Sequence, residues 1–172
     1  GTTTGLSNKV RAISAGGFND PGVSNVIESS NFETRGTFSD FGDLTQARQQ
    51  AMGSSNQHGG LQEFHPRAPE LYSPTGKVVP SGFGQGDLGV FNGGESPSNT
   101  NVVDFVQIST IGNAMDFGDL PSANANGGAM ASATRYVTQG DNNANQDTHT
   151  TEFSTKGNLS FFGDLTAQGY LG

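Results

Sequence analysis

The first residue type that could bind a metal ion or a sugar is an aspartate that recurs in the phrase Phe-Gly-Asp-Leu. Its three copies are Asp43, Asp119 and Asp164. Each could be a cation ligand or a sugar contact. A calcium site, however, needs roughly six to eight oxygen ligands, and one carboxylate in each of three separate turns does not assemble them. We therefore interpret the phrase as structural, with Phe in the core, Gly in a tight turn and Asp as a local hydrogen-bond acceptor.

Histidines are the second candidates for chemistry. His58 and His65, with Glu63 between them, could bind zinc. The chain has no Cys, and nothing around this pair supplies the remaining ligands. There is also no Gly-x-Ser-x-Gly elbow, and no glycine-rich phosphate loop with its Lys. We expect no metal, no cofactor and no enzymatic activity.

The phrase around each aspartate is longer than four residues. It runs over Thr34–Leu44, Thr110–Leu120 and Thr155–Leu165, in gap-free alignment with the residues before it. A catalytic site is usually assembled once, so three copies at corresponding positions favour a repeated architecture. The apolar residues that the copies share are the expected repeat core: Phe41, Leu44, Phe117, Leu120, Phe162 and Leu165.

Each repeat contains up to four short segments that read as β-strands. Apolar and polar residues alternate in "VVDFVQI", and Gly, Asn and Asp bound the runs, which is typical of antiparallel strands. We predict one all-β domain over 1–172, a closed ring of about three four-stranded antiparallel repeats resembling a β-propeller or β-prism. The expected repeat units span about 10–57, 86–134, and 135–172 together with 1–9.

The two ends of the chain suggest how such a ring would close. The third repeat stops where its fourth segment, the counterpart of the Ala-Met segments 51–56 and 129–134, should begin. Residues 5–17 align without gaps on 129–141, with Arg11 falling on Arg135. We therefore expect the N-terminal strand, Gly5–Ile13, to complete the last repeat by pairing with residues 150–165, which would leave no exposed edge.

Residues 58–85 interrupt the repeat. Three prolines within 66–74 favour an insertion, and a shortened fourth blade is the alternative. Loops on a rigid repeat scaffold commonly bind partners, and this one mixes apolar and basic groups as interfaces do. The candidate partner-binding residues are Leu61, Phe64, Arg67, Leu71, Tyr72, Lys77 and Phe83.

Charge and hydropathy narrow the classes of partner. The formal net charge is −8, and the eight basic residues are scattered. Binding to a nucleic-acid backbone calls for clustered Lys and Arg, so we expect no nucleic-acid partner. No apolar run approaches the length of a membrane span, so we expect no membrane partner. The composition predicts a small apolar core, which contacts between subunits could supplement, so a homo-oligomer is compatible with the sequence.

The longest repeat resembles a known kind of protein. "VVDFVQISTIGNAMDFGDLPSA", followed by "ATRYVTQGD", is similar to repeats in virion structural proteins of tailed bacteriophages, notably marine and cyanobacterial ones. The match is strong over 100–141, fair over 24–44 and 145–165, and absent over 58–85. The units also look like kelch-type propeller repeats, although the Trp that marks an ordinary kelch blade is missing.

The resemblance implies a non-enzymatic virion protein, exposed on a phage particle as a surface protrusion, decoration or fibre module. Its partners would be other virion proteins of the capsid or tail, and it would be assembled in the host cytoplasm. The alternative is a receptor- or carbohydrate-binding adhesin at the tail tip, with a host surface receptor as partner. The absence of Trp and the presence of only three Tyr weaken a lectin reading. A secreted hydrolase built on a propeller is disfavoured by the missing catalytic residues.

Overall fold

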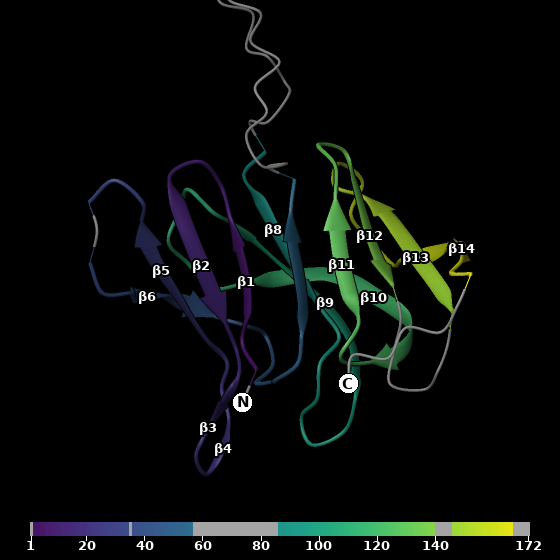
Figure 1. Cartoon of the computed structure of the whole chain (residues 1–172), viewed down its shortest axis with the longest axis horizontal. Helices are drawn as coiled ribbons and strands as arrows, with labels where there is room; N and C mark the ends of the chain where they lie inside the picture. The colour runs from purple at the N-terminus through teal and green to yellow at the C-terminus, as the bar shows by residue number, and fades with distance from the viewer. Residues whose placement is uncertain (1, 35, 57–85, 140–145, 167–172) are drawn as a thin grey trace, which may run out of the picture.

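A computed structural model describes residues 2–34, 36–56, 86–139 and 146–166. These residues form fourteen strands, arranged as three four-stranded antiparallel sheets and one small hairpin (Figure 1). The all-β class predicted from the alternating pattern is therefore confirmed. The described residues include no helix that could cross a membrane.

The first sheet has the strand order β1-β2-β5-β6, and the hairpin β3-β4 projects from the connection between β2 and β5. Its strands and the hairpin are β1 (Thr4–Ser7), β2 (Arg11–Ala15), β3 (Phe18–Asn19), β4 (Gly22–Val23), β5 (Val26–Asn31) and β6 (Ser39–Asp43). The second sheet consists of β7 (Met52–Ser55), β8 (Leu88–Asn92), β9 (Thr100–Gln107) and β10 (Met115–Asn124). The third consists of β11 (Gly128–Ala131), β12 (Arg135–Gln139), β13 (Asp147–Glu152) and β14 (Ser160–Asp164).

The prediction that the N-terminal strand pairs with the last repeat is wrong. Strand β1 pairs with β2 in its own sheet, with Leu6 opposite Ile13. A local turn decides this pairing, because the side-chain oxygen of Asn8 accepts hydrogen bonds from the main-chain N–H groups of Val10 and Arg11. Such a side-chain-capped turn folds the two strands onto each other without any distant partner.

The Ala-Met segments were the expected fourth strands of the repeats, and the structure assigns them differently. They form β7 and β11, which begin the second and third sheets instead of ending the first and second. Each sheet is thus a meander of strands that are consecutive in the chain, apart from the inserted hairpin. In the described part of the chain, the third sheet consists of β11 to β14, and none of these strands comes from the N-terminus.

The three sheets follow one another in a row. Strand β7 contacts both β1 and β11, so the first strands of the sheets lie side by side in chain order. In Figure 1 the first and third sheets lie at opposite ends of the long axis. Among the described residues, the sheets do not close into a ring.

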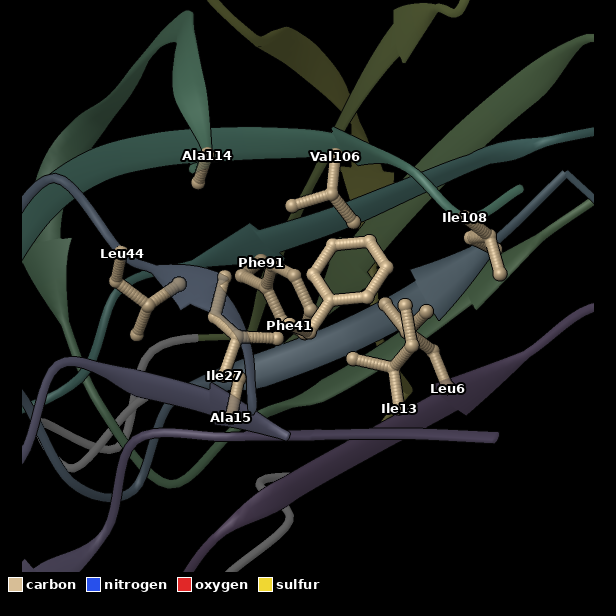
Figure 2. Close-up of a cluster of buried hydrophobic side chains, with 10 residues drawn as sticks. All are labelled: Leu6, Ile13, Ala15, Ile27, Phe41, Leu44, Phe91, Val106, Ile108 and Ala114. Carbon is tan, nitrogen blue, oxygen red and sulfur yellow. The ribbon is translucent and has the colours of Figure 1, made fainter. Parts of the chain in front are cut away.

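Two apolar clusters fill the spaces between successive sheets. The first lies between sheets one and two, and Figure 2 shows the ring of Phe41 in the middle of it; its residues are Leu6, Ile13, Ala15, Ile27, Phe41, Leu44, Phe91, Val106, Ile108 and Ala114. The second lies between sheets two and three, and consists of Val90, Val103, Phe105, Phe117, Leu120, Tyr136, Phe153 and Leu159. The second sheet therefore contributes core residues from both of its faces.

Candidate functional site at the joints between sheets

The repeated phrase forms the contact between the first and second sheets, here called joint 1. The main-chain oxygen of Phe41 accepts a hydrogen bond from Gly112 N at 2.9 Å, and that of Asp43 accepts one from Ala114 N at 2.8 Å. Asp43 N in turn donates to the side-chain oxygen of Asn113 at 3.1 Å. The Phe-Gly-Asp strip of one sheet thus holds the Gly-Asn turn of the next.

Joint 2, between the second and third sheets, repeats this arrangement atom for atom. Phe117 O accepts from Gly157 N at 2.7 Å, and Asp119 O accepts from Leu159 N at 2.9 Å. Asp119 N donates to the side-chain oxygen of Asn158 at 3.1 Å. The eleven-residue phrase therefore has two halves, a Gly-Asn turn that docks on the preceding sheet and a Phe-Gly-Asp strip that receives the following one.

This geometry corrects the roles expected for Gly and Asp in the phrase. Gly42 and Gly118 have φ angles of 151° and 146°, which other residues rarely adopt. A Cβ atom on Gly42 would lie 2.4 Å from Gly112 O, and one on Gly118 would lie 2.4 Å from the carbonyl carbon of Gly157. The glycine thus permits close approach of two sheets, and the aspartate contributes through its main-chain N–H and C=O.

The repeat-core residues do not all share one environment. The rings of Phe41 and Phe117 are 1% and 3% exposed, and Leu44 and Leu120 are buried beside them. The sequence predicts the same burial for Phe162, but its ring is 54% exposed and Leu165 is only partly buried. The reason is positional, because Phe162 belongs to the third sheet and no described sheet packs over it.

The remaining predicted site residues lie outside the described residues. These are all the candidate partner-binding residues of 58–85, together with the possible zinc ligands His58, Glu63 and His65. In the ranges that the structure does describe, no group of three or more His, Asp and Glu side chains could hold a metal ion. Asp43, Asp119 and Asp164 lie in three different sheets.

A buried ion pair that was not predicted from the sequence crosses joint 1. Arg48 Nη2 lies 2.7 Å from Asp104 Oδ2, and both side chains are fully buried. The same carboxylate accepts hydrogen bonds from the hydroxyl of Thr45 at 2.6 Å and from its main-chain N–H at 3.2 Å. These contacts fasten the connection between β6 and β7 onto β9.

Two opposing electrostatic effects act on the pKa of Arg48. Burial lowers the pKa of Arg48, while the adjacent Asp104 carboxylate counteracts that effect. A second guanidinium hydrogen bond, from Nη1 to Val102 O at 3.2 Å, adds to the compensation. One signal in the sequence was available: an acid at a position of the alternating run "VVDFVQI" flanked by apolar residues needs a partner if the strand is buried on both faces.

A buried hydrogen-bond chain plays the corresponding role at joint 2. The hydroxyl of Tyr136 donates to the side-chain oxygen of Asn92, whose nitrogen lies 3.2 Å from the hydroxyl of Thr138. Burial raises the pKa of Tyr136, so the hydroxyl stays protonated and can act as the donor. The network ties β8 of the second sheet to β12 of the third.

Cationic side chains cover the aromatic rings at both joints. The guanidinium carbon of Arg11 lies 5.6 Å from the centre of the Phe41 ring, and its Nη1 donates to Ile108 O at 2.8 Å. At joint 2, the ammonium of Lys156 lies 3.9 Å from the centre of the Phe105 ring. Such contacts add modest attraction to the apolar packing. Together, these groups are suited to holding sheets at a defined spacing.

Comparisons with known proteins give no family assignment. No protein-family model matches this chain, and no curated protein sequence matches it significantly.

Proposed function

We propose that this chain is a non-enzymatic structural component of a tailed-phage virion, exposed as a surface protrusion, decoration or fibre module. The observation that carries the structural role is the repeated joint. The most distinctive phrase in the sequence supplies matching main-chain hydrogen bonds and buried rings at two successive contacts between sheets. Asp43 and Asp119, the residues that first suggested chemistry, thereby have a structural role through their main-chain groups.

The virion location rests on the sequence resemblance over 100–141. That stretch covers β9 to β12, and it contains the Gly-Asn turn that docks at joint 1 and the Phe-Gly-Asp strip that receives the third sheet at joint 2. The resemblance thus covers one side of each joint. Under this proposal, the sheets form a propeller- or prism-like scaffold, and the chain works by holding its place beside other capsid or tail proteins.

Location on intact particles tests the proposal. Antibodies raised against the recombinant chain would be used for immunogold electron microscopy of purified phage particles from the source, with mass spectrometry of the same particles. Regular labelling of heads or along fibres is the expected result. Labelling confined to the tail tip would favour the adhesin instead. A chain that is missing from purified particles by both methods would overturn the virion role.

A further inference from the structure

Several positions that are buried in the internal joints carry exposed side chains on the two end sheets, among them Phe32, Phe38 and Phe162. We name two surfaces by these positions. The trailing face, on the third sheet, consists of Arg135, Phe162, Gly163, Asp164, Leu165 and Thr166. The leading face, on the first sheet, consists of Glu28, Phe32, Gly36, Thr37 and Phe38. The gap-free alignment of the three repeats makes the trailing face the counterpart of a Phe-Gly-Asp strip, and the leading face the counterpart of a Gly-Asn turn.

The trailing face has an Arg–Phe contact like that of joint 1 and an unobstructed glycine. The guanidinium carbon of Arg135 lies 6.0 Å from the centre of the Phe162 ring, as Arg11 lies over Phe41 at joint 1. The Nε and Nη2 atoms of Arg135 bind Glu152, which leaves the orientation of the guanidinium defined. A Cβ atom on Gly163 would meet nothing within 4 Å, whereas the same atom on Gly118 would collide with the next sheet.

The leading face carries apolar side chains at positions that are buried in the later repeats. Phe32 and Phe38 are 56% and 42% exposed. Their counterparts in the second repeat, Ile108 and Ala114, are buried in joint 1. The first sheet thus exposes to solvent the face that, in the second and third sheets, packs against the preceding sheet.

The polar groups on the two faces also match. At joint 1, Thr45 donates twice to the carboxylate of Asp104. Thr166 is the counterpart of Thr45 after the third Phe-Gly-Asp-Leu phrase, and Glu28 is the counterpart of Asp104. The acid therefore lies on the leading face, and the hydroxyl and the guanidinium lie on the trailing face.

We propose that the trailing face of one copy docks on the leading face of a second copy, forming a third joint between molecules. Arg135 Nη1 then donates to the main-chain oxygen of Phe32, as Arg11 does to Ile108 in joint 1. The turn at Gly36–Thr37 docks beside Phe162, and Thr166 donates to Glu28. Because the two faces are different surfaces, the contact is heterologous, and repetition gives either a closed ring of copies or a filament.

A second copy is favoured over an unrelated partner, because this chain carries both halves of the contact. In joint 1, a Phe-Gly-Asp strip flanked by Arg and Thr covers the counterpart of the leading face, and the trailing face has the same set of residues. One substitution weakens the joint between copies. Thr37 stands where the internal joints have Asn113 and Asn158, and its shorter side chain reaches less far toward the N–H of Asp164.

Sedimentation velocity over a concentration series tests the proposal with two blocked variants of the full chain. Gly163→Val fills the trailing face, and Phe38→Asp places a charge in the leading face. Association of like copies needs both faces, and each variant keeps only one of them. Each variant alone is therefore expected to stay monomeric, with self-association weakened by roughly 30-fold or more. An equimolar mixture of the two is expected to form dimers and nothing larger, while the wild-type chain continues to grow with concentration.

A gain-of-function variant provides the converse test. Thr37→Asn restores the acceptor of the internal joints and is expected to strengthen association by roughly 2- to 10-fold, the effect of one hydrogen bond. Circular dichroism melts in dilute solution check that the variants fold. Phe162→Ser serves as a second trailing-face variant if Gly163→Val does not fold.

Three outcomes would overturn the proposal. The wild-type chain could remain monomeric over the whole concentration range. Either folded blocked variant could associate with itself as tightly as wild type, which would indicate a contact between like faces or a different surface. The mixture of the two blocked variants could fail to form dimers although wild type associates. None of these results bears on the virion location, because immunolabelling does not depend on contact between copies.

Discussion

Replacing the three equivalent phenylalanines by alanine, one at a time, separates the effect of the repeated phrase from the effect of its place in the row of sheets. Phe41 and Phe117 are almost fully buried, so each substitution removes the ring from a closed core and leaves a cavity. Buried Phe-to-Ala changes cost about 3–5 kcal/mol of unfolding free energy. Phe162 is 54% exposed. Its truncation loses roughly half of a burial free energy of about 1.5–3 kcal/mol and encloses no cavity, so the expected cost is about 1 kcal/mol.

Urea unfolding followed by circular dichroism measures the three costs in dilute solution, where copies do not associate. We expect Phe41→Ala and Phe117→Ala to lower the free energy of unfolding by similar amounts. Their melting temperatures should fall by about 6–20 °C, given roughly 2–4 °C per kcal/mol for a domain of this size. Phe162→Ala should shift the melting temperature by only a few degrees.

The result that would refute this reasoning is equal destabilisation by all three substitutions. It would mean that Phe162 is buried in the isolated molecule, and that the trailing face is covered within one chain. A small cost at Phe117 would contradict the joint itself.

Three further predictions concern the joints. Arg48→Met should lower the free energy of unfolding in urea by about 3–5 kcal/mol, because it leaves the buried carboxylate of Asp104 without its cation. The double variant Arg48→Met/Asp104→Leu should recover part of that loss. A double variant that is less stable than the sum of the two single losses would refute this. Gly118→Ala should cost roughly 1–3 kcal/mol or more through overlap with the third sheet, while Gly163→Ala should stay within about 0.5 kcal/mol of wild type by thermal melting. Burial raises the pKa of Tyr136 above its unfolded value of about 10, so the stability due to the protonated hydroxyl is fully present below about pH 10 and is lost as the pH rises above it. Between neutral pH and pH values above about 10, the free energy of unfolding should therefore decline less in Tyr136→Phe than in wild type. Equal declines would contradict a buried, protonated Tyr136.

The sequence alone was enough to predict the all-β class and the existence of three related sheets. Alternation of apolar and polar residues and glycine-bounded runs act within a few residues, so they can be read without knowing the fold. The repeated phrase likewise predicted where Phe41 and Phe117 lie, because a position that recurs in each unit has the same neighbours wherever another unit follows it.

Only the tertiary structure decided which strand pairs with which and what covers each sheet. A strand edge offers the same N–H and C=O groups to any partner, so the pattern of β1 fitted the last sheet as well as its own until the local turn at Asn8 settled the pairing. The ion pair of Arg48 and Asp104 joins residues 56 positions apart, and no local pattern links them. Phe162 has the same local phrase as Phe117 but is exposed, since burial depends on the next sheet in space and not on the residues beside it in the chain.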